Sequence, residues 1–330
     1  MRQFLAALVI LLALYLTLSH FTEVRLVWET LRRGNLFWLA LGTLVQITWL
    51  INTAQTYRAI YRLLDMQISL RRLAPLVATG NFVNVVAPSG GVSGIAVFVA
   101  DARRHDLSTA RVTIAGVLFV LFEYFGFLCV LALGLIVLIR RNSLNAAEIG
   151  ASAVLLMAAL ALAGLLALGV RSAQALERVL AWAARAVNRL VRPVIRRDYL
   201  SEARAHTFAV EAAEGLRALQ SDWREYLKPA GLSLLGKALL ICILFLTFLA
   251  FKQPFSPGTL IAGFSVGFLF LIVSPTPSGL GIVEGVMTLT LRSLGVPLEA
   301  ATVITLAYRG LTFWLPFAYG FVALRLTRWE

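Results

Sequence analysis

The sequence predicts an all-α polytopic membrane protein with about six full spans and two re-entrant helical hairpins in an inverted repeat. Composition is the first observation behind this prediction: 59% of the 330 residues are hydrophobic, and the mean hydropathy is +0.82. The second is that several apolar runs reach the roughly 18–20 residues that a helix needs to cross a bilayer. The third is a pair of apolar segments that proline and glycine interrupt.

The segment at residues 267–285, GFLFLIVSPTPSGLGIVEG, is apolar enough to enter a bilayer, yet it contains two prolines and four glycines. A plain spanning helix does not tolerate that density of helix breakers. In lipid, a broken backbone persists only where protein or a water-filled cavity shields its polar groups. We therefore predict a re-entrant hairpin with its turn at residues 275–281 and Glu284 on the second arm.

A similar segment, GNFVNVVAPSGGVSG at residues 80–94, occurs earlier in the chain. In both segments a glycine lies eight residues before a proline, and a Ser-Gly pair follows. The similarity extends to VLFVLFEYFGF and VITLAYRGLTF, which places Glu123 opposite Arg309. Because an odd number of crossings separates the two hairpins, we predict that they open from opposite sides. Inverted repeats of this kind place a site near the membrane midplane.

Four regions follow along the chain. Residues 1–34 are expected to hold a first span at 4–21 and a short connection; the span is predicted to be retained, with a cleaved signal peptide as the alternative. Residues 35–170 form the first membrane half, with re-entrant segment 73–100 and full spans near 35–63, 112–139 and 151–170. Residues 171–229 form a basic amphipathic linker. Residues 230–330 form the second half, with re-entrant segment 257–294 and a last span near 300–324; the span before this segment begins near residue 229.

The linker carries arginines on one helical face and apolar residues on another. The basic face consists of Arg171, Arg178, Arg185, Arg189 and Arg192. This pattern is typical of an amphipathic helix at an anionic membrane surface. A solvated helical hairpin packed on itself is the alternative. Replacement of the arginine face by glutamine tests the first interpretation, because it is expected to weaken binding to anionic liposomes.

The formal net charge of +13 agrees with a membrane topology rather than with a nucleic-acid partner. Cytoplasmic loops of membrane proteins carry an excess of lysine and arginine. With two hairpins that return to their own sides, most of the 30 basic residues fall on the side of both termini and the linker. We therefore expect both termini to be cytoplasmic.

Four charged residues fall within the predicted membrane region: Glu123, Lys237, Glu284 and Arg309. Such charges usually face a cavity or a partner. The planar fork of Arg309 suits a phosphate or carboxylate headgroup, and an ion pair with Glu123 or Glu284 is the alternative. Three roles remain open for the two glutamates: they bind a cationic headgroup, carry a proton, or neutralise Arg309. Lys237 is expected to extend to the interface.

The predicted substrate-binding set adds residues at the two hairpin turns to these charges. It consists of Arg309, Glu284, Glu123, Asn84, Pro88, Ser89, Pro275 and Ser278. The polar side chains among them are also able to satisfy backbone groups that the turns leave free. This structural role and ligand contact both remain open at these positions.

Three motifs carry a resemblance to a known family: GNFVNVVAPSGG from Gly80, PSGLGIVEG from Pro277, and AYR at 307–309. From about Asn35 onward, the chain resembles the transmembrane family of lysylphosphatidylglycerol synthase/flippase, including members without the synthase domain. This resemblance implies a lipid transporter of the bacterial cytoplasmic (inner) membrane. Its partners would be membrane lipids of the phosphatidylglycerol, aminoacylated or isoprenoid type, and a lipid-synthesising enzyme.

Other function classes differ from a lipid transporter in the residues that they require. An enzyme is not expected, because the chain lacks a large polar domain and its histidines lie at the end of a span or outside the spans. No catalytic dyad, metal site or cofactor is therefore predicted. A small-solute secondary transporter is an alternative, since broken helices in inverted repeats also serve that class. A membrane scaffold for a lipid or envelope biosynthesis enzyme is another.

Overall fold

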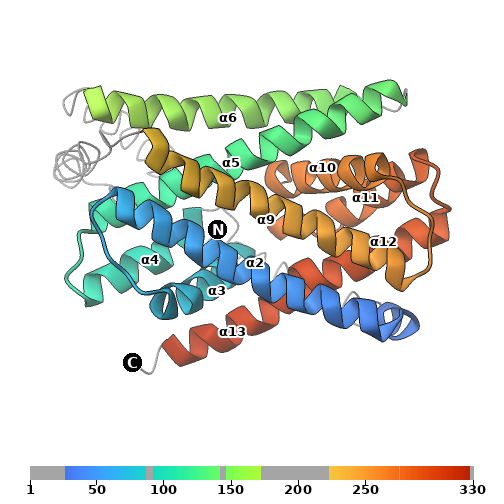
Figure 1. The fold of residues 1–330 in the computed structure, drawn as a ribbon, viewed down its shortest axis with the longest axis horizontal. Helices are drawn as coiled ribbons and strands as arrows, with labels where there is room; N and C mark the ends of the chain where they lie inside the picture. Colours follow the sequence, from blue (N-terminus) through green and yellow to red (C-terminus); the bar gives the residue numbers. More distant parts are fainter. Residues whose placement is uncertain (1–26, 87–91, 142–145, 172–222, 275, 328–330) are drawn as a thin grey trace, which may run out of the picture.

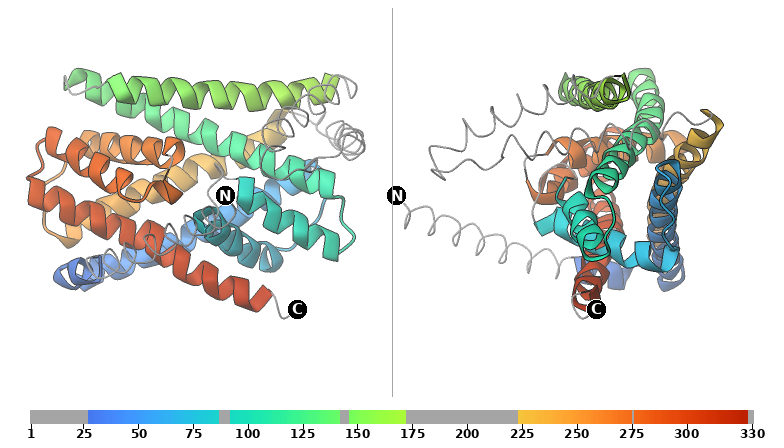
Figure 2. Two further views of the ribbon diagram at one scale, coloured as in Figure 1. Left: turned by 180° about the vertical axis from the view of Figure 1, so that it is seen from behind. Right: turned by 90° about the vertical axis from the view of Figure 1, so that its left-hand side faces the viewer.

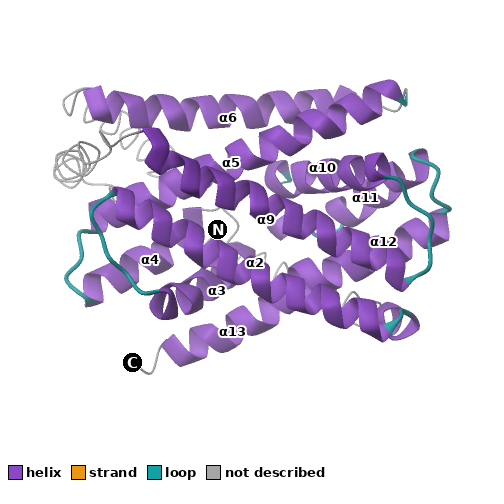
Figure 3. Cartoon of the chain, viewed as in Figure 1, coloured by secondary structure: helices purple, strands orange, loops and turns teal. Residues whose placement is uncertain are grey.

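The computed structural model describes residues 27–86, 92–141, 146–171, 223–274 and 276–327. Over these ranges the regular elements are helices, and no strand occurs (Figure 3). The predicted first span, the turn residues Pro88, Ser89 and Pro275, and the linker arginines Arg178, Arg185, Arg189 and Arg192 lie outside the described residues. The predictions made for them are therefore untested.

After a short helical stretch at residues 27–33, the first half of the described chain contains five helices whose bounds lie close to the predicted segments. They are α2 (Leu36–Leu63), α3 (Leu70–Val86), α4 (Val92–Arg104), α5 (Thr109–Arg140) and α6 (Ala146–Arg171). The second half contains five α-helices and two short turns. They are α9 (Trp223–Ala250), α10 (Pro257–Val273), the 3₁₀ turn η1 (Pro277–Gly279), α11 (Ile282–Ser293), α12 (Leu298–Arg309), the π-helical turn η2 (Gly310–Trp314) and α13 (Leu315–Thr327).

Within the described ranges, three helices are both long and apolar enough to cross a membrane: Leu36–Leu63, Thr109–Arg140 and Arg224–Ala250. Two shorter apolar helices, Ala146–Ala161 and Pro257–Val273, accompany them. These helices confirm the prediction of a helical membrane protein. The number of full spans and the re-entrant character of the hairpins remain predictions.

The two broken segments each form a pair of packed helices. Helices α3 and α4 pack against each other, as do α10 and α11. Figure 1 shows these pairs at opposite ends of the long axis, with the long helices α2 and α9 packed side by side between them. Helix α6 lies on the outside of the molecule against α5 (Figure 2).

Glycine allows the helices of each pair to approach closely. A Cβ on Gly80 of α3 would lie 3.3 Å from the ring of Phe98 in α4. A Cβ on Gly267 of α10 would lie 3.1 Å from the sulfur of Met287 in α11. The two glycines are the ones that the sequence pattern matched to each other, and both lie where one arm contacts the other.

The helix contacts between the two halves are also matched, with a glycine at each contact. Helix α5 of the first half packs against α10 of the second, and α13 of the second half packs against α3 of the first. A Cβ on Gly134 of α5 would collide with Ser265 of α10. A Cβ on Gly320 of α13 would lie 2.5 Å from the carbonyl oxygen of Ala78 in α3. Gly134 and Gly320 are separated along the chain by the same interval as Glu123 and Arg309.

The turns that precede the two helix pairs also share one backbone geometry. Asp65 follows α2 with φ 55°, and Lys252 follows α9 with φ 53°. Immediately after each of them, a backbone N–H donates to a carbonyl of the preceding helix: Met66 to Tyr61, and Gln253 to Phe248. Non-glycine residues rarely adopt positive φ. The same uncommon turn therefore occurs at matched positions of the two halves.

Helix starts follow from local capping. The side chain of Asn35 accepts a hydrogen bond from the Phe37 N–H at the start of α2. Ser108 caps α5 in the same manner, and Ser256 caps α10 immediately before Pro257. These side chains satisfy N–H groups that have no partner within the helix.

The apolar core has two large parts. One gathers residues of α5, α9, α10, α11 and α12, including the fully buried Phe127, Phe248 and Leu269. The other gathers residues of α2, α3, α4 and α5, including Ile60 and Leu73. The charged side chains of the membrane region lie among these packed helices.

Candidate functional site

Arg309 lies at a break in the helical pattern. It is the last residue of α12, and the π-helical turn η2 follows it directly before the chain continues as α13. Single π-helical turns within α-helices are frequent at functional sites. Arg309 is 4% exposed, so its guanidinium is buried between packed helices. The last span was predicted to be continuous from about residue 300 to 324, so this turn was not foreseen from the sequence.

The guanidinium contacts the start of α11 and the turn that precedes it. Its Nε lies 2.5 Å from Oε1 of Glu284, at the start of α11. Its Nη2 donates to the carbonyl oxygen of Ser278, 3.0 Å away. The guanidinium carbon also lies 4.5 Å from the centroid of the Phe313 ring. Arg309 therefore joins α12 to the turn between α10 and α11.

Ser278 presents its carbonyl from an uncommon conformation, with φ 49° and ψ 28°. Left-handed backbone of this kind costs a non-glycine residue about 1–2 kcal/mol. Such outliers persist where the surrounding structure holds them, and they cluster at functional sites.

The pair of Arg309 and Glu284 leaves hydrogen-bonding capacity unused. Oε2 of Glu284 is buried and has no hydrogen-bond partner in the described part of the chain. A guanidinium has five N–H donors, and the two contacts above use one donor each. Arg309 lines a cavity of about 110 Å³ with mostly apolar and aromatic neighbours. The lining residues are Trp49, Leu240, Gly267, Phe268, Leu271, Val283, Tyr308, Arg309 and Thr312.

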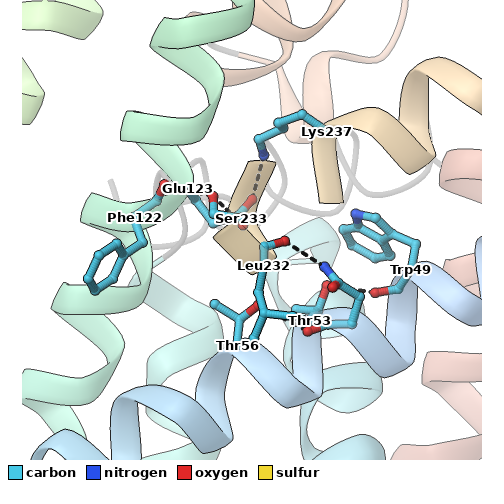
Figure 4. Close-up of polar contacts among 9 residues, drawn as sticks. Trp49, Thr53, Thr56, Phe122, Glu123, Leu232, Ser233 and Lys237 are labelled. Atoms are coloured by element: carbon cyan, nitrogen blue, oxygen red, sulfur yellow. Dashed lines mark hydrogen bonds and ion pairs between the residues drawn. The ribbon is translucent and has the colours of Figure 1, made fainter. Parts of the chain in front are cut away.

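A second ion pair joins α5 and α9. Nζ of Lys237 lies 2.5 Å from Oε2 of Glu123, and the Lys237 side chain is 1% exposed. The hydroxyl of Ser233 donates to the Phe122 carbonyl at 2.7 Å and lies 3.2 Å from Oε1 of Glu123. Figure 4 shows Lys237 and Ser233 directed from α9 toward Glu123. Nearby, Asn52 of α2 donates to the Leu232 carbonyl at 2.9 Å.

Phe268 of α10 contacts one ion pair and lines the cavity that contains the arginine of the other. Nζ of Lys237 lies 4.3 Å from the centroid of its ring. The same residue lines the cavity that contains Arg309. A ring face attracts a cation that is placed above it. Phe268 therefore extends from the Lys237 ammonium to the lining of the Arg309 cavity.

A small cavity in the first half occupies the matching place. It has a volume of about 60 Å³ and is lined by Thr53, Tyr57, Val77, Gly80, Asn81, Asn84, Gly94, Phe98, Phe119 and Val120. Thr53, Gly80, Asn81 and Asn84 correspond by chain interval to Leu240, Gly267, Phe268 and Leu271 of the Arg309 cavity. Each half therefore has a cavity built from equivalent positions, and only the second contains a charged group.

Asn84 connects the arms of the first helix pair. Its Oδ1 accepts hydrogen bonds from the Gly94 N–H at 2.6 Å and from the Ser93 hydroxyl at 2.8 Å. The sequence left a structural role and ligand contact open for Asn84. The structure assigns it the backbone contact, and Asn84 also lines the small cavity.

The structure decides how the predicted charges pair. Of the two partners predicted for Arg309, the structure shows Glu284 and not Glu123. The expectation for Lys237 was wrong: this residue does not extend to the interface but pairs with Glu123. Helix α9 begins at Trp223, earlier than predicted, which places Lys237 about 20 Å along the helix axis. The distance to the helix end explains why the side chain takes a local partner.

Ser233, Phe268 and Tyr308 were not among the site residues predicted from the sequence. For Ser233, the sequence did contain one indication. Ser233 lies four residues before Lys237, which places both side chains on one face of a helix. Nothing in the sequence distinguished Phe268 or Tyr308 from other apolar residues of their segments.

Comparison with known protein families identifies the family of this chain. The family model described as lysylphosphatidylglycerol synthase TM region matches residues 3–320. The chain belongs to this family. The match covers nearly the whole chain and confirms the resemblance that the three motifs carried. No curated protein and no solved structure matched the chain.

Proposed function

We propose that this protein is a lipid transporter that moves an amphipathic phospholipid between the leaflets of the bacterial cytoplasmic membrane. In this proposal the chain crosses the membrane about six times with both termini in the cytoplasm. The helix pairs α3/α4 and α10/α11 are re-entrant hairpins of an inverted repeat. The matched turns, glycine contacts and cavities of the two halves support this arrangement.

The observation that carries the proposal is the cavity at Arg309. A buried arginine there retains unused N–H donors, and Glu284 beside it retains a buried oxygen without a partner. Desolvated arginine binds phosphate through charge-assisted hydrogen bonds. The remaining walls are mostly apolar and aromatic, which suits a phosphodiester that stays attached to acyl chains. The name of the family points to lysylphosphatidylglycerol, a lipid with a phosphodiester headgroup.

The two ion pairs suggest how a headgroup could pass through the protein. A phosphate that reaches Arg309 competes with Glu284 for the guanidinium, and a cationic group on the same headgroup pairs with the carboxylate that this frees. The pair of Glu123 and Lys237 lies next along the route, beyond Phe268. Exchange of partners between opposite charges keeps every buried charge compensated, which avoids the cost of an unpaired ion in the membrane.

Leaflet exchange in proteoliposomes tests the proposal. The lipid panel consists of phosphatidylglycerol, its lysyl ester and a polyprenyl phosphate. Wild type is compared with Arg309→Ala and with Arg292→Ala, a matched control whose arginine is exposed at the end of α11. We expect selective exchange of one lipid class, loss of that exchange in Arg309→Ala, and normal exchange in the control.

Two results would contradict the proposal. If folded, correctly oriented protein exchanges no lipid, the lipid-transporter function is wrong, and uptake of a soluble compound or recruitment of a synthase becomes the function to test. If exchange occurs but Arg309→Ala leaves it unchanged, the route does not pass the Arg309 cavity.

A further inference from the structure

A separate cavity lies at the end of the molecule where α2 turns into α3. Its volume is about 650 Å³, and its lining includes Arg58, Arg62, Asp65, Met66, Ile68 and Ser69. Met66 and Ile68 are buried and form an apolar part of the wall. The cavity shares no lining residue with the Arg309 cavity, so that it is a distinct place in the fold.

Two arginines give this cavity a positive charge. Arg58 and Arg62 lie one helical turn apart on α2, which directs both side chains to one face. Neither forms an ion pair in the described part of the chain, whereas Arg72 nearby is held by Asp101 at 2.6 Å. Asp65 is the one carboxylate of the lining; it is exposed and has no ion pair in the same part of the chain. The lining therefore has an excess of positive charge.

The start of α3 adds to this charge. Ser69 lines the cavity and immediately precedes Leu70, the first residue of the helix. The first turn of α3 contains no acidic residue. The N–H groups of a first helical turn lack partners within the helix, and together with the helix dipole they favour an anion. Two arginines and a helix N-terminus thus converge on one cavity.

The other half of the protein shows that the turn geometry alone does not create the cavity. The turn after α9 has the same backbone conformation, yet Phe245 and Leu249 occupy the positions that match Arg58 and Arg62. Phe255 occupies the position that matches Ile68, and its ring packs against Phe245 with centroids 5.0 Å apart. Aromatic packing thus fills in one half the place that two arginines line in the other.

We propose that the Arg58/Arg62 cavity binds a phosphate group. The guanidinium fork and a helix N-terminus are both common phosphate ligands. The phosphate comes either from the headgroup of a lipid in the adjacent leaflet or from a soluble phosphate compound. This binding is separate from transport and is measurable on a protein that moves no lipid.

Equilibrium binding to the purified full chain in a zwitterionic detergent tests the proposal. One arm titrates inorganic phosphate against chloride at equal ionic strength. The second titrates a short-chain phosphatidylglycerol below its micelle concentration, with the matching diacylglycerol, which has no phosphate, as reference. Heat of binding is measured for wild type and for Arg58→Gln/Arg62→Gln. The charge-matched control is Arg71→Gln/Arg103→Gln, whose exposed arginines lie at the same end outside the cavity lining.

A third variant tests the cavity without removing charge. Ile68→Phe introduces the side chain that fills the matching place in the other half. We expect Arg58→Gln/Arg62→Gln to bind at least about tenfold more weakly, because a charge-assisted hydrogen bond contributes about a factor of ten. Ile68→Phe is expected to weaken binding as well, and the control is expected to bind as wild type does.

The two arms separate the sources of the phosphate. Binding in the inorganic arm supports the site with a soluble ligand, and binding of phosphatidylglycerol alone supports it with a lipid headgroup. No binding in either arm overturns the proposal. The proposal is also overturned if Arg71→Gln/Arg103→Gln weakens binding as much as Arg58→Gln/Arg62→Gln does, because the effect is then one of general surface charge. Since neither arm measures transport, failure here is distinguishable from failure of the proposed function.

Discussion

The buried pair of Glu123 and Lys237 yields a prediction whose magnitude follows from the burial of its two members. Removal of one partner of a buried ion pair costs about 3–5 kcal/mol, because it leaves an uncompensated charge. Lys237 is 1% exposed and Glu123 is 22% exposed. The carboxylate also has the hydroxyl of Ser233 nearby, whereas the ammonium retains only the ring of Phe268 within the described residues.

The two single variants should therefore differ. Glu123→Gln leaves the more deeply buried charge unpaired and is expected to cost about 4 kcal/mol in the free energy of unfolding. Lys237→Met leaves a carboxylate with partial exposure and a hydroxyl donor, and is expected to cost about 2–3 kcal/mol. The double variant carries no unpaired charge, and its free energy of unfolding should lie within about 1 kcal/mol of wild type.

Reversible unfolding in mixed detergent micelles, followed by tryptophan fluorescence, measures these free energies. The double-mutant cycle then gives the coupling energy between the two side chains. A sum of single losses that exceeds the loss in the double variant by about 3 kcal/mol or more supports a compensated pair. Additive losses, or a larger loss for Lys237→Met than for Glu123→Gln, would refute the reasoning from burial.

Three further predictions use the same unfolding measurement. Gly320→Ala should lower the free energy of unfolding by about 1–3 kcal/mol, since its Cβ would lie 2.5 Å from the Ala78 carbonyl oxygen. The control Gly150→Ala meets nothing within 4 Å and should instead stabilise α6 by up to about 1 kcal/mol. Equal losses of stability in the two variants would contradict the packing argument. Asn84→Ala should lower the free energy of unfolding by about 1–2 kcal/mol, because the Gly94 N–H loses its acceptor. Asn84→Asp is the control that keeps an acceptor oxygen. Unchanged stability in Asn84→Ala would exclude this structural role. Ser278→Gly should stabilise the protein by about 1 kcal/mol, because glycine adopts φ 49° without steric cost; destabilisation would show that the serine side chain has a role of its own.

Much of the helical organisation followed from the sequence, because helix breakers and apolar runs act locally. The bounds predicted for the span at residues 35–63 agree with α2 to within one residue. The two segments selected for their prolines and glycines both fold as helix pairs. The start of α9 was placed later than Trp223, because the polar residues up to Lys228 were assigned to the linker, whereas α9 includes the last of them and Pro229. The error in the expected position of Lys237 came directly from this boundary.

The candidate site was predictable in its residue types and not in its pairing. Arg309, Glu284 and Glu123 were selected because a charge at membrane depth needs a cavity or a partner. Which carboxylate pairs with Arg309 depends on how α11 and α12 pack, and no local pattern encodes that packing. Phe268 is one of many phenylalanines in the sequence, and its contact with Lys237 arises only when α9 and α10 come together.

The sequence by itself determined that this chain is a helical membrane protein with two interrupted segments and isolated charges among apolar residues. Hydropathy and chain breakers determine these properties because they depend on the composition of single segments. Only the tertiary structure decided that Glu123 pairs with Lys237, that Arg309 pairs with Glu284, and that Arg58 and Arg62 share a cavity. Each of these contacts joins segments distant in the chain or depends on the turn between them, so that it exists only once the helices have packed.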